Sequence, residues 1–593
     1  MPKTEFQQRI TKLIAILAVG VVVLGLRLLD VQGINSGDYA TRAQNELYLT
    51  STLLAPRGEI TDINGIAFAR SVSRINIVVD QKMIANPEAT AAIAAPILNM
   101  SQSDVLSRIV GEKRWYLVSR NATPAQWNEL KTAFATYNSG LSKQEFNKRI
   151  VGFFPERNYS REYPAGSTVA SLIGFTNQAG EGAAGIESAM NSTLKGQDGK
   201  YVYANGIWAE IPGTQQQIVQ AKSGNSIRLT IDRDIQYVAE NAIAKAVKAS
   251  MAKSGTVIVM DPKTGQILAH ATAPTFDPNK PVKLSDVHNA SVEEVYEPGS
   301  TGKVMTLAAA IEENLVTPTT VFTVPYALKT KYATFHDHER HPNQQLTTAG
   351  ILAVSSNTGT IQIGAKLSDQ KLYDYLRAFG VGSSTESGLP GESSGLINSP
   401  NNWSGTSKPT MSFGQGYSLT AMQATSIFAT IANDGVRVEP TVIAGTLDAQ
   451  GHYTPAKSRK NIRVVSAETA QKMRLMMESV VSANGTAPSA AIPGYRIAGK
   501  TGTAQRSVNG HYSGYTASFI GFAPADNPRY VISVTIQAPQ GMHWGGVLGG
   551  PVFKEVMSYV LEAKHIPPSN TKVTPIPLNA AQLAAVAPKE KKQ

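Results

Sequence analysis

The sequence predicts an α+β protein with a membrane anchor, an elongated pedestal domain and a larger domain whose antiparallel sheet is flanked by helices. Three observations predict it. An unbroken apolar run starts at Leu13, the pattern of the chain changes near Ser226, and strand-like segments beyond Tyr495 precede a closing helix. We expect these boundaries: a cytoplasmic N-terminus at 1–12, the anchor at 13–33, the pedestal at 34–225, the second domain at 226–565 and a disordered tail at 566–593.

The composition is that of a folded protein. The chain has 593 residues, enough for two or three domains with sizeable cores, and 42% are hydrophobic against 17% charged. The formal net charge of +11 is modest for this length, and no basic stripe with interleaved aromatic residues indicates nucleic-acid binding. There is no cysteine, which excludes disulfides, thiolate metal sites and cysteine nucleophiles.

The expected anchor is the apolar run from Leu13 to Leu26, extended past Arg27 to Val31. With this extension the run reaches the roughly 20 residues that span a bilayer. Three basic residues precede it, so the N-terminus should stay inside and the rest of the chain should be exported. The rival is a cleaved signal peptide, which the absence of a small-x-small cleavage site disfavours.

The expected pedestal offers no catalytic grouping. Residues 57–65 predict a strand leading into a tight Asn-Gly turn. Residues 85–98 and 126–137 predict helices, and glycines punctuate the loops that follow. Spacing and interaction are the tasks that we expect of this region.

The second domain is expected to begin with a strand at 227–231 and a helix at 235–252. Strands at 256–260 and 266–271 flank a turn, so Lys263-Thr264-Gly265 is interpreted as turn chemistry. The segments 515–523 and 530–537 predict further strands, and 551–563 predicts a helix. Beyond Ile566 the chain is rich in Pro, Ala and Lys, which predicts disorder.

Three short motifs occur in a fixed order: Ser300-Thr301-Gly302-Lys303, then Ser355-Ser356-Asn357, then Lys500-Thr501-Gly502. Each tripeptide or tetrapeptide alone is weak, because Ser-x-x-Lys occurs five times in the chain and Lys-Thr-Gly twice. Context distinguishes Ser300, which follows Glu-Pro-Gly and precedes a run of strong helix formers. Residues i and i+3 are neighbours on a helix, so the amine of Lys303 can activate the hydroxyl of Ser300.

This order and context resemble the class B penicillin-binding proteins, whose three motifs are a known signature shared with the serine β-lactamases. The resemblance covers nearly the whole chain beyond the tail. It predicts a dimerisation-type pedestal and a transpeptidase fold like that of the penicillin-binding proteins and β-lactamases. It rests also on Pro56-Arg57-Gly58, Asp62, Asn64-Gly65, Tyr163-Pro164-Ala165-Gly166, Gly185-Ile186-Glu187, Asp261 to Gly265, Tyr296 to Ser300, Phe413 to Gly416 and Ala498 to Gln505.

The resemblance implies a role for each motif residue. Ser300 would take the acyl group of a D-Ala-D-Ala stem peptide, and Lys303, with a pKa lowered by burial or by the charge of Lys500, would accept its proton. Ser355 would relay a proton to the leaving amine. Asn357 would hold both the substrate amide and Lys303.

The third motif would hold the substrate. Lys500 and Thr501 would anchor the substrate carboxylate, and Gly502 would keep the strand free of a side chain where substrate lies. The backbone N–H groups of Ser300 and Thr503 would form the oxyanion hole. One departure is Gly302, where the family often has Phe; we expect looser packing there.

The resemblance therefore implies a peptidoglycan D,D-transpeptidase that is acylated by β-lactams. The runs 413–416 and 495–505 are more like the cell-division (septal) type than the elongation type. The expected partners are stem peptides, β-lactams, a polytopic membrane glycosyltransferase and divisome proteins, with the catalytic domain outside the cell membrane at the septum. The alternatives are an elongation-type enzyme, a carboxypeptidase or β-lactamase that uses water, and a non-enzymatic sensor or scaffold.

No cofactor and no metal are expected. His336, His338 and His341 lie close together with two acidic residues between them, which could suggest zinc. They are not at i, i+4 on an evident helix, and the following Pro342-Asn343 marks a loop. We interpret the cluster as a solvated or hydrogen-bonded loop.

Overall fold

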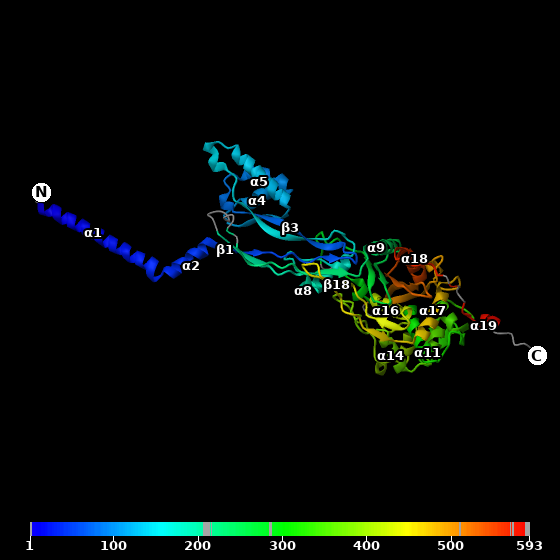
Figure 1. Cartoon of the computed structure of the whole chain (residues 1–593). Helices are drawn as coiled ribbons and strands as arrows, with labels where there is room; N and C mark the ends of the chain where they lie inside the picture. The colour runs from blue at the N-terminus through cyan, green and yellow to red at the C-terminus, as the bar shows by residue number, and fades with distance from the viewer. Residues whose placement is uncertain are drawn as a thin grey trace, which may run out of the picture. The chain divides into compact units, whose positions relative to one another are not determined.

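The computed structural model describes residues 3–204, 214, 216–283, 287–508, 511–569, 571 and 575–586, and Figure 1 draws its course. The chain forms two compact units. The first comprises 1–56, 72–160 and 196–224, and the second comprises 57–71, 161–195 and 225–593. The segment 34–225, expected as one domain, is thus divided between the units.

The N-terminus of the first unit is a long apolar helix, α1 (Lys3–Leu29), continued by a π-helical turn (Asp30–Ile34). The segment Thr4–Ile34 has a mean hydropathy of 2.4 and is not buried in the molecule, and it is long enough to cross a membrane. The helix begins ten residues before the expected start of the anchor, because residues 3–12 continue the same helix.

The rest of the first unit has a small core of its own. Helices α3 (Pro87–Leu98), α4 (Gln102–Ile109) and α5 (Pro124–Ser139) bury apolar side chains with β4 (Tyr116–Ala122) and the end of β3 (Ala67–Val79). The helices expected at 85–98 and 126–137 are confirmed. Other elements are α2 (Ser36–Leu47), β5 (Phe153–Glu162) and a three-stranded sheet in the order β1 (Tyr48–Leu53), β6 (Gly199–Ala204), β7 (Gln216–Val219).

The second unit is built on a five-stranded antiparallel sheet. Its strand order is β10 (Ile267–Ala273), β9 (Ser254–Met260), β23 (Tyr530–Gln537), β22 (His511–Ala523), β21 (Ala498–Val508). The β9–β10 hairpin confirms the turn interpretation of the first Lys-Thr-Gly. The side chain of Asp261 accepts the N–H of Lys263 at 2.8 Å, and Gly265 has a φ of 75°.

Helices cover both faces of this sheet (Figure 1). Side chains alternate along a strand, so Phe519 packs its ring on Phe553 of α18 (Gly545–Ala563), while Ser533 bonds Thr425 of α16 (Ala421–Ala432) at 2.7 Å. Helix α9 (Arg233–Ala249) contacts α18 and the strands β9 and β10. The strand β21 is an edge strand, which leaves one side of it open to a ligand.

The remaining helices form a second group in this unit. They are η5 (Gly299–Gly302), α11 (Lys303–Glu312), α12 (Thr348–Ala353), α13 (Asn357–Gly364), α14 (Asp369–Ala378), α15 (Ser407–Ser412) and α17 (Ala467–Val481). Short strands lie between them, among them β12 (Val321–Val324) and β15 (Gln344–Thr347), which pair with each other. Ahead of α9 in the chain, β8 (Ser226–Leu229) pairs with β2 (Ile60–Thr61).

The closing helix begins six residues before the expected 551. Four glycines precede Pro551, and they predict a loop by propensity. Tertiary packing explains the difference, because a Cβ at Gly545 would lie 2.2 Å from the carbonyl oxygen of Ser518 and one at Gly549 would lie 2.9 Å from Phe519. The glycines let α18 approach the sheet closely.

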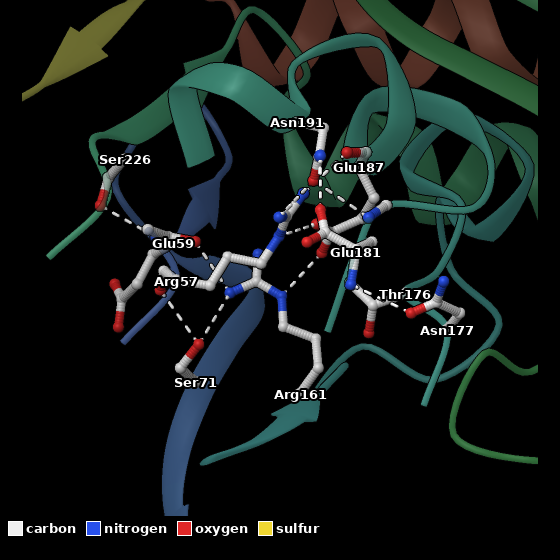
Figure 2. Close-up of polar contacts among 12 residues, drawn as sticks. Arg57, Glu59, Ser71, Arg161, Thr176, Asn177, Glu181, Glu187, Asn191 and Ser226 are labelled. Carbon is white, nitrogen blue, oxygen red and sulfur yellow. Dashed lines mark hydrogen bonds and ion pairs between the residues drawn. The ribbon is translucent and has the colours of Figure 1, made fainter. Parts of the chain in front are cut away.

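A buried ion cluster explains two of the early motifs (Figure 2). Glu187 is fully buried between two arginines: its Oε2 accepts Nε of Arg57 at 2.6 Å, and its Oε1 accepts Nε of Arg161 at 2.7 Å. Arg57 also donates to Oδ1 of Asn191 at 2.6 Å, and Arg161 donates to the carbonyl of Gly58 at 2.8 Å. These bonds join the first two segments of the second unit, 57–71 and 161–195.

The C-terminal segment corrects the expectation of disorder for part of its length. Residues 575–586 form a short stretch and the helix α19 (Ala580–Val586), and Asn579 pairs with Leu346 in an antiparallel bridge. Ile576 and Leu578 pack against the main core, which composition alone did not reveal. Residues 570, 572–574 and 587–593 of the expected tail lie outside the described residues.

Candidate active site

Ser300 lies in the 3₁₀ turn η5, three residues before Lys303, with which α11 begins. Two glycines build the turn. Gly299 has a φ of 52° and donates its N–H to the carbonyl of Gly414 at 2.8 Å, and a Cβ at Gly414 would lie 1.9 Å from the carbonyl oxygen of Gly299. The run 413–416 is therefore the support of the Ser300 turn.

The three motifs meet at one hydroxyl. Lys500 Nζ donates to Ser355 Oγ at 2.9 Å, and Lys303 Nζ lies 3.2 Å from the same oxygen. Lys303 Nζ also donates to the carbonyl of Ser355. The chain thus brings Lys303, Ser355 and Lys500 together from α11, from the turn after α12 and from the edge strand β21, as the family resemblance implied.

Burial changes the protonation of both lysines. Lys303 and Lys500 have no exposed surface. Burial lowers the pKa of Lys303 to about 7, although the carboxylate of Asp337 opposes this change. Burial, and then the charge of Lys303, hold the pKa of Lys500 well below its usual range. Burial is therefore the cause of the low pKa of Lys303, and the neighbouring charge that we expected to act on it acts on the pKa of Lys500.

Ser355 is held in a strained backbone conformation with a φ of 63°. Its N–H donates to the carbonyl of Leu352 at 3.2 Å, so the end of α12 fixes it. A β-unbranched residue with positive φ is uncommon and is found where the surrounding structure enforces it. In this conformation Ser355 Oγ lies within hydrogen-bond distance of both lysine amines.

Asn357 differs from its expected role. Its Nδ2 donates to the carbonyl of His336 at 3.1 Å, and among the residues that the structure describes it makes no hydrogen bond to Lys303. The carbonyl of Ser355 takes the place of that expected bond to Lys303.

Asp337 is a site residue that the motifs did not reveal. Its Oδ2 accepts Ser356 Oγ at 2.6 Å, its Oδ1 accepts the N–H of Thr358 at 2.9 Å, and it is nearly buried. His341 Nε2 lies 3.1 Å from the same carboxylate. Asp337 thus orders the Ser355–Asn357 turn, and its position within an acidic and histidine-rich loop was the only available signal.

The third motif lies on the edge strand β21. Thr501 Oγ1 pairs with Thr486 Oγ1 at 2.9 Å and also receives Lys500 Nζ at 3.2 Å. Thr503 Oγ1 accepts the N–H of Gly545 at 3.1 Å, at the start of α18. A Cβ at Gly502 would lie 2.4 Å from Ser518 Oγ and 3.0 Å from the carbonyl of Pro298. Gly502 is thus required by the packing of the Ser300 turn on β21.

Gly302 does not leave the packing loose. A Cβ at this position would lie 2.4 Å from the hydroxyl of Tyr417 and 2.8 Å from Cα of Gly414. The buried side chain of Tyr417 occupies the space beside Gly302, so the looser packing expected there is not found. Its hydroxyl has no hydrogen-bond partner among the described residues, and burial raises the pKa of that hydroxyl.

The histidine loop contributes rings to the mouth of the site. His338 packs on Trp544 with a centroid distance of 4.3 Å, and His543 stacks on Tyr515 at 4.0 Å. Trp544 directly precedes Gly545, whose N–H bonds Thr503. Within the described residues, no three acidic or histidine side chains have the arrangement of a metal site.

Comparison with known proteins gives two matching family models. The model of the penicillin-binding protein transpeptidase domain matches residues 255–558, and that of the penicillin-binding protein dimerisation domain matches residues 52–229. The first match contains Ser300, Ser355 and Lys500.

Relatives match over almost the full length. Penicillin-binding protein PbpB of Mycolicibacterium smegmatis is 35% identical, covering 96% of this chain and 92% of that protein. The probable peptidoglycan D,D-transpeptidase PenA of Neisseria meningitidis is 32% identical, covering 96% and 93%. The crystal structure of penicillin-binding protein 3 of Mycobacterium tuberculosis with aztreonam has a TM-score of 0.69 at 30% identity, covering 89% of this chain and 100% of that one.

Proposed function

We propose that this chain, which belongs to the penicillin-binding protein family and is a serine-type transpeptidase, cross-links peptidoglycan stem peptides through an acyl-enzyme on Ser300. The observation that carries the proposal is that two fully buried lysines, Lys303 and Lys500, both contact the hydroxyl of Ser355. A lysine with a pKa of about 7 is neutral in roughly half of the molecules at pH 7 and can then accept a proton, unlike an ordinary lysine. The PenA relative is named as a peptidoglycan D,D-transpeptidase.

The first half-reaction forms the acyl-enzyme. Neutral Lys303 accepts the proton of the Ser300 hydroxyl as the oxygen attacks the carbonyl carbon between the two D-alanines. The backbone N–H groups of Ser300 and Thr503 stabilise the oxyanion. The C–N bond then breaks, and Ser355, bonded to both amines, passes a proton to the leaving D-alanine.

The second half-reaction transfers the acyl group. The amine of a neighbouring stem peptide attacks the ester carbonyl, and the Ser300–acyl bond breaks as the proton returns through Ser355 and Lys303. The cross-link is the product, and Ser300 is restored. Lys500 and the Thr501 hydroxyl bind the terminal carboxylate of the donor, whose negative charge raises the pKa of Lys500 and restores its proton.

The same chemistry makes Ser300 the site of β-lactam acylation. A β-lactam offers a strained amide and a carboxylate to the same groups, and the mycobacterial relative was crystallised with aztreonam. Lys500 and Thr501 would bind the carboxylate of the drug as they bind that of the stem peptide. The stable ester then blocks the second half-reaction.

The cellular role that we propose is cross-linking at the division septum. The proposal is supported by the resemblance of the runs 413–416 and 495–505 to the septal type and by the apolar helix α1, which fits a membrane anchor. No glycan-polymerising motif was found ahead of residue 226, so a polytopic membrane glycosyltransferase is the proposed partner, together with divisome proteins. Midcell enrichment of a fluorescent fusion would support this role, and uniform sidewall labelling would contradict it.

The experiment that tests the reaction is covalent labelling with a fluorescent penicillin. Wild-type protein should hold the label for many minutes, and Ser300→Ala should hold none, because the only nucleophile that forms the ester is gone. Ser192→Ala is the matched control, since Ser192 begins another Ser-x-x-Lys but is exposed on the short helix α8 (Asn191–Leu194). Rapid release of the label by the wild-type protein would contradict the transpeptidase proposal and would favour a β-lactamase, which hydrolyses the acyl-enzyme.

A further inference from the structure

The C-terminal segment 575–586, here called the strap, contacts the chain directly ahead of Ser355. The N–H of Thr347 donates to the carbonyl of Leu578 at 3.1 Å, and its hydroxyl donates to the carbonyl of Pro577 at 2.7 Å. The same hydroxyl accepts the N–H of Gly350 at 3.0 Å and so caps α12. The strap therefore fixes the side chain that begins this helix.

Helix α12 passes this constraint on to the active site. It is six residues long and every one of them is buried, so it moves as one rigid piece. The carbonyl groups of Ile351 and Leu352, in its last turn, accept the N–H groups of Ser356 and Ser355. A shift at Thr347 therefore moves the Ser355 hydroxyl.

The chain just before the strap contacts the segment ahead of Lys500. The carbonyl of Gly494 accepts the N–H of Ser569 at 2.9 Å, and Ser569 Oγ accepts the N–H of Arg496 at 3.2 Å. Arg496 Nη1 donates to Thr571 Oγ1 at 2.9 Å. Two residues later the strand β21 begins, and it carries Lys500 to Ser355.

We propose that the strap is a positioning element for the reaction, and that it sets the contact between Ser355 and Lys500 by holding α12 at Thr347. The proposal rests on the roles proposed above for those two residues. The strap is attached lightly to the core: its Ile576 and Leu578 are only partly buried against it, α19 has no buried residue, and a cavity of about 430 Å³ lies between α19 and α17. Its loss should therefore leave the core in place.

Gly350 offers a selective way to displace the strap. A Cβ at this position would lie 1.8 Å from the carbonyl oxygen of Leu578, closer than any real contact, and backbone cannot rotate away as a side chain can. Alanine favours a helix more than glycine does, so Gly350→Ala does not weaken α12 itself. The substitution removes the strap from α12 in an otherwise intact chain.

The test is a double-mutant cycle on penicillin acylation. Deleting 575–593 and substituting Gly350→Ala in the full chain should each lower the first-order acylation rate constant about tenfold, because displacement of a reacting group by a fraction of an ångström has this effect. The dissociation constant of the initial penicillin complex should change far less. Gly350→Ala added to the deleted chain should lower the rate no further, since no strap remains to be displaced.

Two controls accompany the cycle. Deletion of 587–593 removes the end of the chain beyond the strap and should leave the rate unchanged. Gly140→Ala tests the same exchange where the nearest atom to the new Cβ is 3.5 Å away. Wild-type acylation by the chain that lacks 575–593, or equal further losses from Gly350→Ala with and without the strap, would overturn the proposal. Labelling of Ser300→Ala would instead overturn the proposed reaction, so the two failures are distinguishable.

Discussion

The second unit contains two buried clusters of basic side chains, and only one of them includes a carboxylate that pairs with the basic groups. In the first, Glu187 lies between Arg57 and Arg161, and each guanidinium has an oxygen partner. In the second, Lys303 and Lys500 share one neutral hydroxyl. An arginine keeps its charge and must be paired, whereas a lysine can lose its proton when burial makes the charge costly. The first cluster thus stabilises the fold, whereas the second keeps Lys303 able to act as a base at neutral pH.

The largest expected effect follows from removal of that base. Lys303→Met should lower the penicillin acylation rate about 10²–10⁴-fold, the usual contribution of a general base. The free energy of unfolding should change by no more than about 1–3 kcal/mol, because the apolar chain removes the cost of burying the amine but leaves the carbonyl of Ser355 without its donor. Stopped-flow labelling and urea unfolding measure the two quantities.

The control for this variant is Lys371→Met, which removes the lysine of another Ser-x-x-Lys. Its side chain is 53% exposed and pairs with Glu313. Neither the acylation rate nor the stability should change measurably. If Lys303→Met were acylated at the wild-type rate, Lys303 could not be the general base.

The second effect concerns the paired cluster. Glu187→Gln leaves two buried arginines without their carboxylate and should cost about 3–5 kcal/mol of stability. The midpoint of urea unfolding, followed through tryptophan fluorescence, should fall accordingly. The penicillin acylation rate of the molecules that remain folded should be close to wild type, because no contact of Glu187 reaches Ser300 among the described residues.

Glu181→Gln is the matched control. Glu181 bonds the same Asn191 but pairs with Lys195 at the surface, where a carboxylate contributes at most about 1 kcal/mol. An equal loss of stability from both variants would contradict the distinction between a buried and an exposed carboxylate.

The smallest expected effect tests the packing beside the base. Gly302→Ala should cost about 1–3 kcal/mol, because the new methyl group meets the hydroxyl of Tyr417. Tyr417→Phe alone should be neutral or slightly stabilising, since it removes a buried hydroxyl that has no partner. The double variant should recover part of the loss, because the contact of the new methyl group with Cα of Gly414 remains. Additive losses in thermal unfolding would show that Tyr417 is not the obstacle.

The pairing of Ser300 with Lys303 could be proposed from the sequence because it is local. Ser300 with Lys303 is one helical turn, and the β9–β10 hairpin shows in its own turn residues. The order of the motifs then supplied the rest through the family resemblance. The start of α18 was missed because four glycines argue against a helix, while their close packing on Ser518 and Phe519 depends on the tertiary fold.

The long-range contacts could not be predicted from the sequence either, because they too depend on the tertiary fold. Asp337 orders the Ser355 turn from about twenty residues away, and the strap meets Thr347 from 230 residues away. The tail has the composition of a disordered segment, and only Ile576 and Leu578 offer apolar anchors. Nothing in the local pattern indicates which surface such a short segment will bind.

The central claim is that a buried, neutral Lys303 is the base, and the pH dependence of acylation tests it most directly. The pKa of about 7 predicts a rate constant that rises between pH 6 and 8 as Lys303 loses its proton. A rising limb with its midpoint near pH 7 is the predicted result. A rate constant that is unchanged from pH 6 to 9 would contradict the account.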